Sequence, residues 1–417
     1  MKICHLNHTD LAGSAFNGYD LMNTIGSGFD LSQIVLWKRS SHKRVYSVQL
    51  EETLHNHVKW LEYKNNLNHL LIPYAKGIVS HTAYKNADII HCHILHNDFV
   101  SVLDYPLIMN SKPCVWTVHD PWLVTGACVF PPVNSCLLWR TGCSNCPETA
   151  NIPFALERDN AEFMWEVKRQ VFKEINPYIV VSTEWMKGYI QQSDITGHFD
   201  KITTIPFGID ISKYDVSRKQ EAKKRLAREP DKINIGIRIE EDEVKGSRYF
   251  FEAMSKIKNK DKVTVSYIGN GEIPENLSRE FSVKKFGWLY DEAEKIEFLL
   301  SADIFVMPSR SESFGLMAIE AMAAGCSIIS FKGTVLEDIT SSPDIGISVE
   351  YLSSEALAES INRLVVNREE IYKRGMAGHE YVGKKFKFDN YVKEHKKLYT
   401  RIKEESDRRR RVLQYML

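Results

Sequence analysis

Short runs of β-branched and aromatic residues recur along this chain, and stretches with a helical spacing of apolar residues separate them. Such runs are typical of strands that are buried on both faces of a sheet. We predict strands at Ile3–Leu6, Ile89–His91, Val115–Val118, Ile179–Val181, Ile202–Ile205, Ile233–Ile237, Val263–Ile268, Ile304–Val306 and Ile328–Phe331. Strands that alternate with helices along a chain form parallel sheets. The pattern therefore predicts an α/β fold.

The length of the chain indicates two domains. Its 417 residues exceed one typical core and suggest two domains of about 200 residues each. Proline and glycine interrupt the pattern at Pro206–Asp210, just before a charged helix and a new strand. We predict an N-terminal domain at residues 1–206, a C-terminal domain at residues 207–388 and a basic helix at residues 389–417.

The stretch from residue 307 to residue 332 sets two carboxylates around the start of a helix. We expect the helix to begin near Phe314 and to end at Gly325, and its unpaired N–H groups suit a phosphate. Glu312 precedes the helix and Glu320 lies on it, so at roughly 1.5 Å per helical residue their carboxylates could be about 10 Å apart. That separation suits the two ends of a nucleotide sugar. Alternatively, the two glutamates are a solvated loop residue and a surface helix residue.

These residues resemble the E-x7-E signature of the family-4 retaining glycosyltransferases, and the match continues through the EAMAAG that begins at Glu320. The resemblance implies that Glu312 lies near the hydroxyls of the transferred sugar and that Glu320 hydrogen-bonds the ribose. It also implies that backbone amides at Phe314 and Gly315, with Leu316 beside them, face the diphosphate.

A second group of motifs resembles the same family: IPFGID from Ile205, INIGIRIE from Ile233 and EDEVKGS from Glu241. Arg238 stands at the carboxyl end of a predicted strand, where ligands bind in open α/β folds, and Lys245 precedes the next helix. Breaking a sugar–diphosphate bond leaves negative charge on phosphate oxygens, which two placed cations stabilise. We assign Arg238 and Lys245 to that task; the alternative is two surface charges without a role.

Three further positions of the donor site follow from the resemblance. The family binds the base at a strand-end loop that corresponds to Gly287–Leu289, so Gly287 and Trp288 are candidate contacts. His119 follows the strand Val115–Val118 and resembles the family's strand-end histidine, which faces the donor sugar. Gly13 resembles the glycine of a loop beside the diphosphate, although a strand, a turn and a helix also describe any α/β unit.

The histidines His91, His93 and His96 lie close together in sequence. We do not predict a metal site there, because His91 and His93 alternate along a strand with Cys92 on its opposite face and no carboxylate cluster is near. We expect one of the two to lie in the core and one near the acceptor.

Four of the eight cysteines fall in one loop, residues 126–147. They are Cys128, Cys136, Cys143 and Cys146. The last two have the spacing of a zinc knuckle, and four thiolates would hold a structural zinc with no open position for catalysis. Two disulfides, which a reducing cytosol disfavours, and four free thiols are the alternatives. A similar stretch occurs in a bacterial subset of family-4 enzymes that build surface polysaccharides, where it borders the acceptor.

Charge excludes one class of partner and suggests another. The formal net charge is zero, and no basic stripe is interleaved with aromatic residues, so we do not expect nucleic acid binding. The basic C-terminal helix, with Arg408–Arg411, is either a solvated face or a contact for anionic lipid headgroups. In the family the last helix packs back on the first domain, and Tyr391, Leu398 and Ile402 would form its apolar face.

The chain shows no sign of a targeting or membrane-spanning segment. Its first residues predict a strand and not a signal peptide, and no apolar run reaches the roughly 18 residues of a membrane span. We therefore expect a cytoplasmic protein, with peripheral contact to the inner face of the membrane.

Together, the resemblance implies the GT-B fold: two Rossmann-like, doubly wound domains, the first on the acceptor side and the second binding the donor. It implies a retaining glycosyltransferase that moves a sugar from a UDP- or GDP-sugar to a hydroxyl of a glycan or lipid-linked acceptor, in bacterial surface polysaccharide synthesis. No catalytic metal is expected, and the predicted site has no Asp-x-Asp motif. A nucleotide-sugar epimerase or phosphorylase of the same fold and a non-catalytic binding subunit are the alternatives.

Overall fold

A computed structural model of the protein describes residues 1–67, 69–131, 136–146, 158–226 and 228–416. The described residues form two compact units. Unit 1 comprises residues 1–131, 136–208 and 388–417, and unit 2 comprises residues 209–387. The chain therefore passes from unit 1 to unit 2 after Gly208 and returns after Lys387.

Unit 1 is built on a parallel sheet of seven strands in the order β3-β2-β1-β4-β5-β6-β7. The strands are β1 (Lys2–Thr9), β2 (Asp30–Trp37), β3 (Val45–Ser47), β4 (Ile89–Cys92), β5 (Cys114–Val118), β6 (Tyr178–Val181) and β7 (Ile202–Thr204). Ile3 of β1 pairs with Leu31 on one side and with Ile89 on the other. The strand order reverses between β1 and β4, where the loops at the carboxyl ends of a doubly wound sheet separate.

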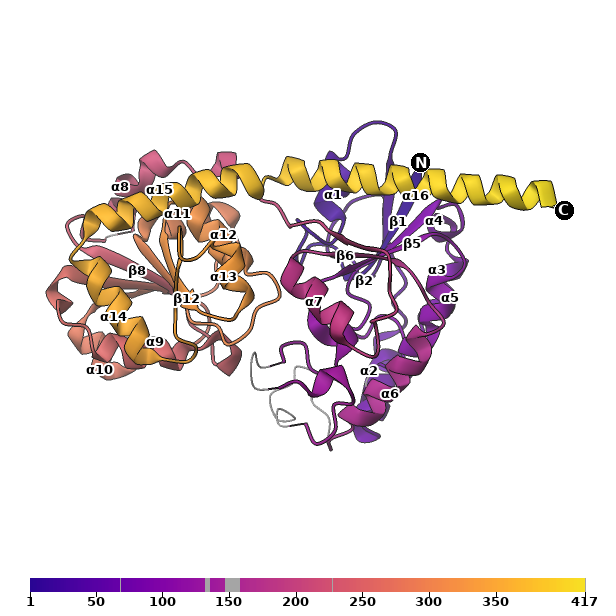
Figure 1. Ribbon diagram of the computed structural model, residues 1–417, viewed down its shortest axis with the longest axis horizontal. Helices are drawn as coiled ribbons and strands as arrows, with labels where there is room; N and C mark the ends of the chain where they lie inside the picture. Colours follow the sequence, from indigo (N-terminus) through magenta and orange to yellow (C-terminus); the bar gives the residue numbers. More distant parts are fainter. Residues whose placement is uncertain (68, 132–135, 147–157, 227, 417) are drawn as a thin grey trace. The chain divides into compact units, whose positions relative to one another are not determined.

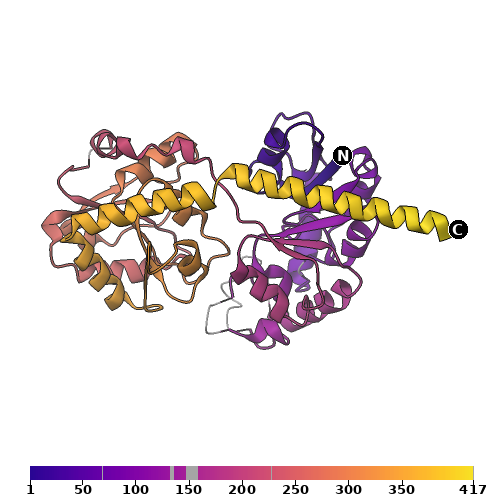
Figure 2. The same cartoon turned by 45° about the horizontal axis from the view of Figure 1, so that its top comes forward.

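Helices pack against both faces of this sheet (Figure 1). They are α1 (Tyr19–Thr24), α2 (Glu52–Lys64), α3 (Ala75–Ser80), α4 (Thr82–Lys85), α5 (Tyr105–Met109), α6 (Ala161–Phe172), α7 (Glu184–Gln192) and α16 (Phe388–Met416). Figure 2 shows that α16 runs along unit 1, where it buries Tyr391, Leu398 and Ile402. Within the described part of the chain, no helix is both long and apolar enough to cross a lipid bilayer.

Unit 2 repeats the architecture with six parallel strands in the order β10-β9-β8-β11-β12-β13. The strands are β8 (Ile233–Arg238), β9 (Val263–Ile268), β10 (Ser282–Lys285), β11 (Ile304–Met307), β12 (Ser327–Phe331) and β13 (Ile347–Val349). The helices are α8 (Lys219–Arg225), α9 (Ser247–Ser255), α10 (Glu275–Glu280), α11 (Glu292–Ser301), α12 (Leu316–Ala323), α13 (Val335–Ile339), α14 (Ser354–Val365) and α15 (Arg368–Lys385). The strand order reverses between β8 and β11.

One polar residue inside β8 ties this sheet to its covering helix. The Asn234 side chain is fully buried, and its amide nitrogen donates to the carbonyl oxygen of Ser301 at 2.9 Å. Its amide oxygen accepts hydrogen bonds from the hydroxyls of Thr264 at 3.1 Å and Ser266 at 2.9 Å. A buried amide with these partners costs little and fixes the position of β8 relative to its neighbours.

The described residues contain all nine predicted strands and four further strands that the sequence pattern did not predict. Two of the missed strands, β3 and β13, have three residues each, which is too short for a pattern to show. β10 is polar, because an edge strand faces water. β2 is a buried strand whose apolar run is interrupted by Gln33.

Candidate functional site

The predicted donor residues of unit 2 gather at the point where its strand order reverses. Arg238 is the last residue of β8, and Lys245 lies in the loop that follows. Gly246 after it has a φ of +70°, and a Cβ atom there would lie 1.9 Å from the carbonyl oxygen of Pro308. Only glycine therefore allows the loop after β8 to pack directly on the loop after β11, which carries Glu312.

Lys245 and Glu312 form an ion pair across these two loops. The Lys245 ammonium donates to the Glu312 carboxylate at 2.9 Å, and the Ser309 hydroxyl donates to the same oxygen at 2.9 Å. The two charged side chains are only 13% and 12% exposed. A pair shielded from water holds its partners more firmly than a surface pair does. The structure thus joins a residue predicted for the sugar to one predicted for the diphosphate.

Arg238 is held by an acidic and an aromatic neighbour. Its guanidinium pairs with the Glu240 carboxylate and lies 4.7 Å from the centre of the Trp288 ring, within the range of a cation–π contact. Trp288 is 42% exposed. Gly287 precedes it with a φ of +68°, and its carbonyl oxygen accepts from the backbone of Gly269 at 3.0 Å. The predicted residues Gly287 and Trp288 therefore lie beside Arg238.

The helix α12 begins at Leu316, two residues later than the predicted start at Phe314. The reason is Gly315, whose φ of +86° lies outside the helical range and whose added Cβ would come within 2.4 Å of the Leu336 side chain. The first backbone N–H bonded inside the helix belongs to Ala318, which donates to Gly315 at 2.9 Å. The N–H groups before it lack helical acceptors, as an anion site at a helix start requires. Phe314 is buried beneath this turn.

Glu320 is a buried residue of α12, so the alternative of a surface helix residue was wrong. Its carboxylate accepts a hydrogen bond at 2.6 Å from the ammonium of Lys295 on α11. Burial raises the pKa of Glu320 above its ordinary value, and the charge of Lys295 offsets part of that rise. The sequence analysis missed Lys295, because it lies on a helix with several other charged residues and no motif marks it.

His119 lies directly after β5 in unit 1. Its ring stacks on Phe207 with the ring centres 5.6 Å apart, and its Nε2 atom lies 3.1 Å from Nδ1 of His93. Burial lowers the pKa of His119 to about 4, so the imidazole is neutral at physiological pH. Gly13 lies in a turn with a φ of +69°, and the first helix, α1, begins six residues later at Tyr19.

His91 and His93 do not divide between the core and the acceptor side, because both are fully buried. Their rings stack with centres 4.3 Å apart, and Cys92 between them contacts Cys114 on the other face of the sheet. Among the described residues, His5, His91 and His93 form one of two groups with potential metal-ligand atoms within 4.8 Å of one another. The other group is Glu62, His69 and Asp98.

The four cysteines of the predicted zinc site form no disulfides in the structure and lie near one another. Burial is the main cause of the raised pKa of Cys128, and the nearby Cys146, Cys136 and Cys143 raise it further. The structure places these four in neither group of ligand atoms within 4.8 Å. Residues 132–135 and 147 of the predicted loop lie outside the described residues.

Backbone groups of the cysteine loop point at two of its sulfur atoms. The N–H of Gly126 donates to Sγ of Cys143 at 3.3 Å, and the N–H of Phe130 bonds the thiol of Cys128. Cys143 and Asn145 both have a φ of +52°, which folds the Cys-x2-Cys segment into a tight turn. N–H groups aimed at sulfur favour the thiolate, the form that binds metal.

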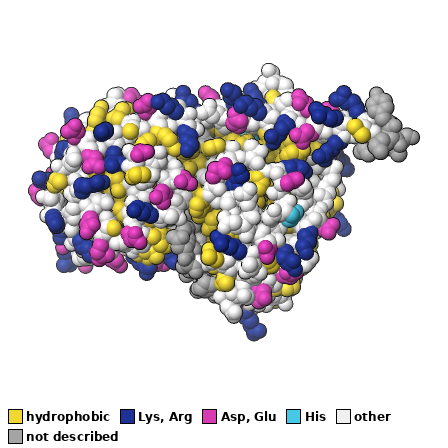
Figure 3. Space-filling view, in the orientation of Figure 1, with side chains coloured by type: hydrophobic (Ala, Val, Ile, Leu, Met, Phe, Trp, Pro, Cys, Tyr) yellow, Lys and Arg dark blue, Asp and Glu magenta, His cyan; other side chains and the backbone are white. Residues whose placement is uncertain are grey.

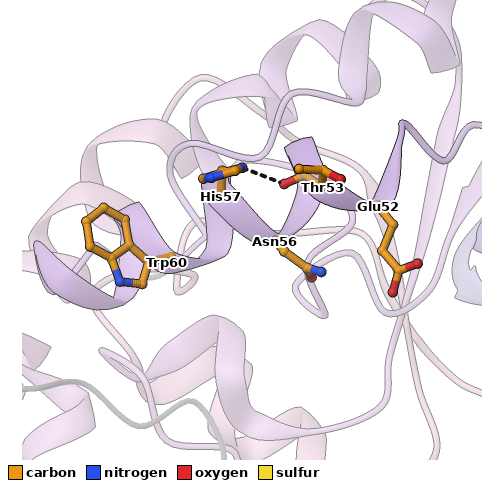
Figure 4. Close-up of a pocket in the computed structure, with 5 residues that line it drawn as sticks. All are labelled: Glu52, Thr53, Asn56, His57 and Trp60. Carbon is orange, nitrogen blue, oxygen red and sulfur yellow. Dashed lines mark hydrogen bonds between the residues drawn. The ribbon is translucent and has the colours of Figure 1, made fainter.

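A hollow on the outer side of α2 has none of the chemistry of the site in unit 2. Figure 4 shows its lining, and its volume is about 660 Å³. The lining residues are Glu52, Thr53, Asn56, His57 and Trp60. They include no lysine or arginine for a phosphate, and the imidazole of His57 is 2.8 Å from the carbonyl oxygen of Thr53 on the same helix.

Two family profiles match the chain, one over each unit. The profile described as Glycosyltransferase Family 4 matches residues 34–213, and the profile described as Glycosyl transferases group 1 matches residues 232–367. The chain belongs to the family-4 glycosyltransferases. The group 1 match contains Arg238, Lys245, Glu312 and Glu320, and the family-4 match contains His119 and the cysteine loop.

Individual family-4 relatives match parts of the chain. WcaC, a putative colanic acid biosynthesis glycosyl transferase of Escherichia coli K12, is 38% identical over 94 residues, which are 21% of this chain and 22% of that protein. The chain matches between 22% and 53% of the length of its first curated relatives.

Solved structures match nearly the whole chain. Sucrose-phosphate synthase from Thermosynechococcus elongatus gives a TM-score of 0.69 with 18% identity, over 96% of this chain and 99% of its own. HepE of Anabaena, in complex with UDP and glucose, gives a TM-score of 0.67 with 14% identity over the same two shares. The fold is GT-B, as the resemblance in the sequence implied.

We predict that Lys295→Met makes the stability of unit 2 more dependent on pH. A buried carboxyl of this kind has a higher pKa in the folded state than in the unfolded state. Its protonated form stabilises the fold, and this contribution is lost as the pH rises above about 4.5. Without Lys295 the pKa of Glu320 rises further, so the loss on the alkaline side should grow. Between pH 5 and pH 8, the unfolding temperature should fall further for the variant than for the wild type.

Two controls isolate the pair in this measurement. Adding Glu320→Gln to Lys295→Met should remove the extra pH dependence, and Lys258→Met, which changes an exposed lysine of the same unit, should behave as the wild type does. Equal pH dependence in Lys295→Met and the wild type would show that Lys295 does not offset the charge of Glu320.

Proposed function

We propose that this protein is a retaining glycosyltransferase that moves a sugar from a UDP- or GDP-sugar to a hydroxyl of a glycan or lipid-linked glycan. One observation carries the proposal: the shielded Lys245–Glu312 ion pair lies beside the start of α12, where the strand order of unit 2 reverses. Ligands of open α/β sheets bind at such a point. The alternatives of an epimerase, a phosphorylase and a binding subunit have no observation of their own in their favour.

The proposed donor site divides the nucleotide sugar among named residues. Arg238 and Lys245 bind the diphosphate oxygens, helped by the backbone N–H groups of Phe314–Leu316 at the start of α12. Glu320 accepts from the ribose hydroxyls, Glu312 accepts from the sugar hydroxyls, and Gly287 with Trp288 contacts the base. The ion pairs support these roles, because they hold the cations in place before the donor arrives and so reduce the ordering that binding requires.

The proposed reaction replaces one bond at the anomeric carbon of the sugar. The bond from this carbon to the β-phosphate oxygen breaks, and a bond to the acceptor oxygen forms on the same face. The acceptor proton passes to the leaving phosphate, which departs as the nucleoside diphosphate. Arg238 and Lys245 contribute by stabilising the charge that develops on the phosphate oxygens. His119, neutral because of its low pKa, would hydrogen-bond a hydroxyl of the donor sugar and would not protonate it.

The acceptor is proposed from the relatives and from the charge of α16. WcaC is described as a colanic acid biosynthesis enzyme, which favours a surface polysaccharide as the product. Figure 3 shows Lys and Arg side chains gathered over α16, and Arg408–Arg411 are exposed. We propose that this helix contacts anionic headgroups on the cytoplasmic face of a membrane, where a lipid-linked acceptor would be held.

A transfer assay with vesicle-borne alkyl glycosides as acceptors tests the donor site and the membrane contact together. With UDP-glucose, UDP-N-acetylglucosamine and GDP-mannose as donors, we expect one donor to give an α-linked product, identified by the anomeric proton in NMR. Lys245→Met and Glu320→Ala should each lower the rate at least about 100-fold, because each removes a contact to the reacting donor. Lys258→Met should keep the rate of the wild type.

Each part of this assay has an outcome that contradicts it. A β-linked product would refute retention, and near-normal transfer by Lys245→Met would refute the donor site. Donor consumed without acceptor would indicate an epimerase. Phosphatidylglycerol in the vesicles should raise the rate over phosphatidylcholine alone, and changing Arg408–Arg411 to glutamine should remove that gain. A rate independent of lipid charge would refute the membrane contact.

We also propose that Cys128, Cys136, Cys143 and Cys146 hold a structural zinc ion. The nearness of the four thiols, the tight Cys143–Cys146 turn and the N–H groups aimed at sulfur support four thiolates around one ion. Such a site is closed, so the ion would stabilise the loop and take no part in sugar transfer.

Metal analysis of the protein purified under reducing conditions tests the zinc proposal. We expect one zinc per chain, with none after Cys143→Ser or Cys146→Ser, and a lower unfolding temperature after chelation. Cys326→Ser changes a buried cysteine of unit 2 and should keep the zinc. Absence of zinc would contradict the proposal, and a thiol titration would then distinguish free thiols from disulfides.

A further inference from the structure

A chain of short polar contacts runs through the interior of unit 1 and ends at His119. Nε2 of His119 is 3.1 Å from Nδ1 of His93, and Nε2 of His93 is 2.8 Å from Nδ1 of His5. Nε2 of His5 is 3.5 Å from the hydroxyl of Tyr399, which is 2.6 Å from Nδ1 of His91. Nε2 of His91 is 2.7 Å from the hydroxyl of Thr117.

The fold places these six side chains in one row. His5 lies on β1 and His91 on β4, the two strands at which the strand order of unit 1 reverses, and Thr117 lies on the neighbouring β5. Tyr399 reaches the row from α16. Gly18 leaves space for the His5 ring. A Cβ atom at Gly18 would lie 2.2 Å from Nδ1 of His5, the atom that contacts His93.

Every imidazole in the row is neutral. Burial lowers the pKa of His5 to about 3 and that of His119 to about 4, and it holds the pKa values of His91 and His93 well below the ordinary range. A neutral imidazole carries one N–H and one lone pair. Each ring that has two neighbours can therefore donate a hydrogen bond to one of them and accept a hydrogen bond from the other. It cannot donate to both or accept from both.

The buried Tyr399 hydroxyl must also donate its one proton to His5 or to His91, its hydrogen-bond partners among the described residues. The row then has two arrangements of its protons. In the first, the Thr117 hydroxyl donates to His91 and every bond points toward His119, so all four histidines carry the proton on Nδ1. In the second, every bond points toward Thr117, and all four carry it on Nε2. The Nδ1 atom of His119 is a donor in the first arrangement and an acceptor in the second. Among the described residues, the hydrogen bond of His119 is made through Nε2 and not through this atom.

The row is not arranged as a metal site. Metal ligands direct their lone pairs at one point, as in a tetrahedral zinc site. Here His93 uses one nitrogen toward His5 and the other toward His119, while both nitrogens of His91 face hydroxyl groups. The contacts follow a line in which each nitrogen except Nδ1 of His119 has its own partner.

We propose that Tyr399 is a positioning residue that couples the tautomer of His119, through His5 and His93, to the tautomer of His91. Tyr399 is the only member of the row that α16 supplies, and its hydroxyl both donates and accepts in either arrangement. It joins the half that contains His91 and Thr117 to the half that contains His119. The helix α16 thus makes the tautomer of His119 depend on the direction of the hydrogen bond between His91 and Thr117. The consequence for sugar transfer rests on the proposed role of His119 beside the donor.

The test is NMR of the full-length protein labelled with 15N-histidine, because long-range proton–nitrogen spectra distinguish the two tautomers. Single His→Gln variants assign the signals. In the wild type, His5, His91, His93 and His119 should all show the same tautomer. In Tyr399→Phe, His91 should no longer agree with the other three, or His119 should show both tautomers. Tyr391→Phe is the matched control, since it removes another buried hydroxyl of α16 that contacts only Phe16 in the hydrogen bonds of the described residues.

Several results would overturn the proposal. Neighbouring histidines with different tautomers in the wild type, a protonated imidazole at pH 7, or an unchanged spectrum of Tyr399→Phe would each do so. Signals that change on chelation would show a bound metal instead of a hydrogen-bonded row. The spectra are recorded without donor, so they do not depend on the proposed function. A tautomer change in Tyr399→Phe with unaltered sugar transfer would support the row and refute the role of His119.

Discussion

The ion pair between Lys245 and Glu312 depends on one constraint: β8 and β11 are adjacent parallel strands at which the order of the sheet reverses. Their following loops part there, and Gly246 lets the first loop rest on the backbone of the second. The lysine and the glutamate then meet in a place shielded from water, where opposite charges attract strongly. The start of α12 follows within the same loop, so cations, carboxylates and the first backbone N–H groups of a helix converge at the carboxyl ends of β8 and β11.

Unit 1 also has a reversal of strand order, but it places a different kind of residue there. Its sheet reverses between β1 and β4, and these strands carry His5 and His91 into the interior instead of presenting charges at the edge. Burial keeps the imidazoles neutral, which makes them hydrogen-bonding groups and not cations. Only His119, one residue beyond β5, brings this interior row to a strand end where a ligand could contact it.

The sequence predicted those features that short patterns carry. Apolar runs located nine strands, and the E-x7-E resemblance located the loop and helix of Glu312 and Glu320. It did not locate Lys295, because a partner on another element has no fixed spacing from the residue that it pairs with. It likewise gave no sign that His5 contacts His93, because the two residues are 88 positions apart in the sequence although their ring nitrogens lie 2.8 Å apart in the structure. The family implied the fold, whereas tertiary packing determined the partners.

We propose above all that unit 2 binds the nucleoside diphosphate of a donor sugar. The most direct test is the unfolding temperature of the protein with UDP, GDP, ADP, TDP or CDP, each without added metal, because a ligand that binds only the folded state raises this temperature. We expect one diphosphate to raise it selectively, and Lys245→Met to abolish the rise. No rise with any of the five, or an equal rise in Lys245→Met, would contradict the account.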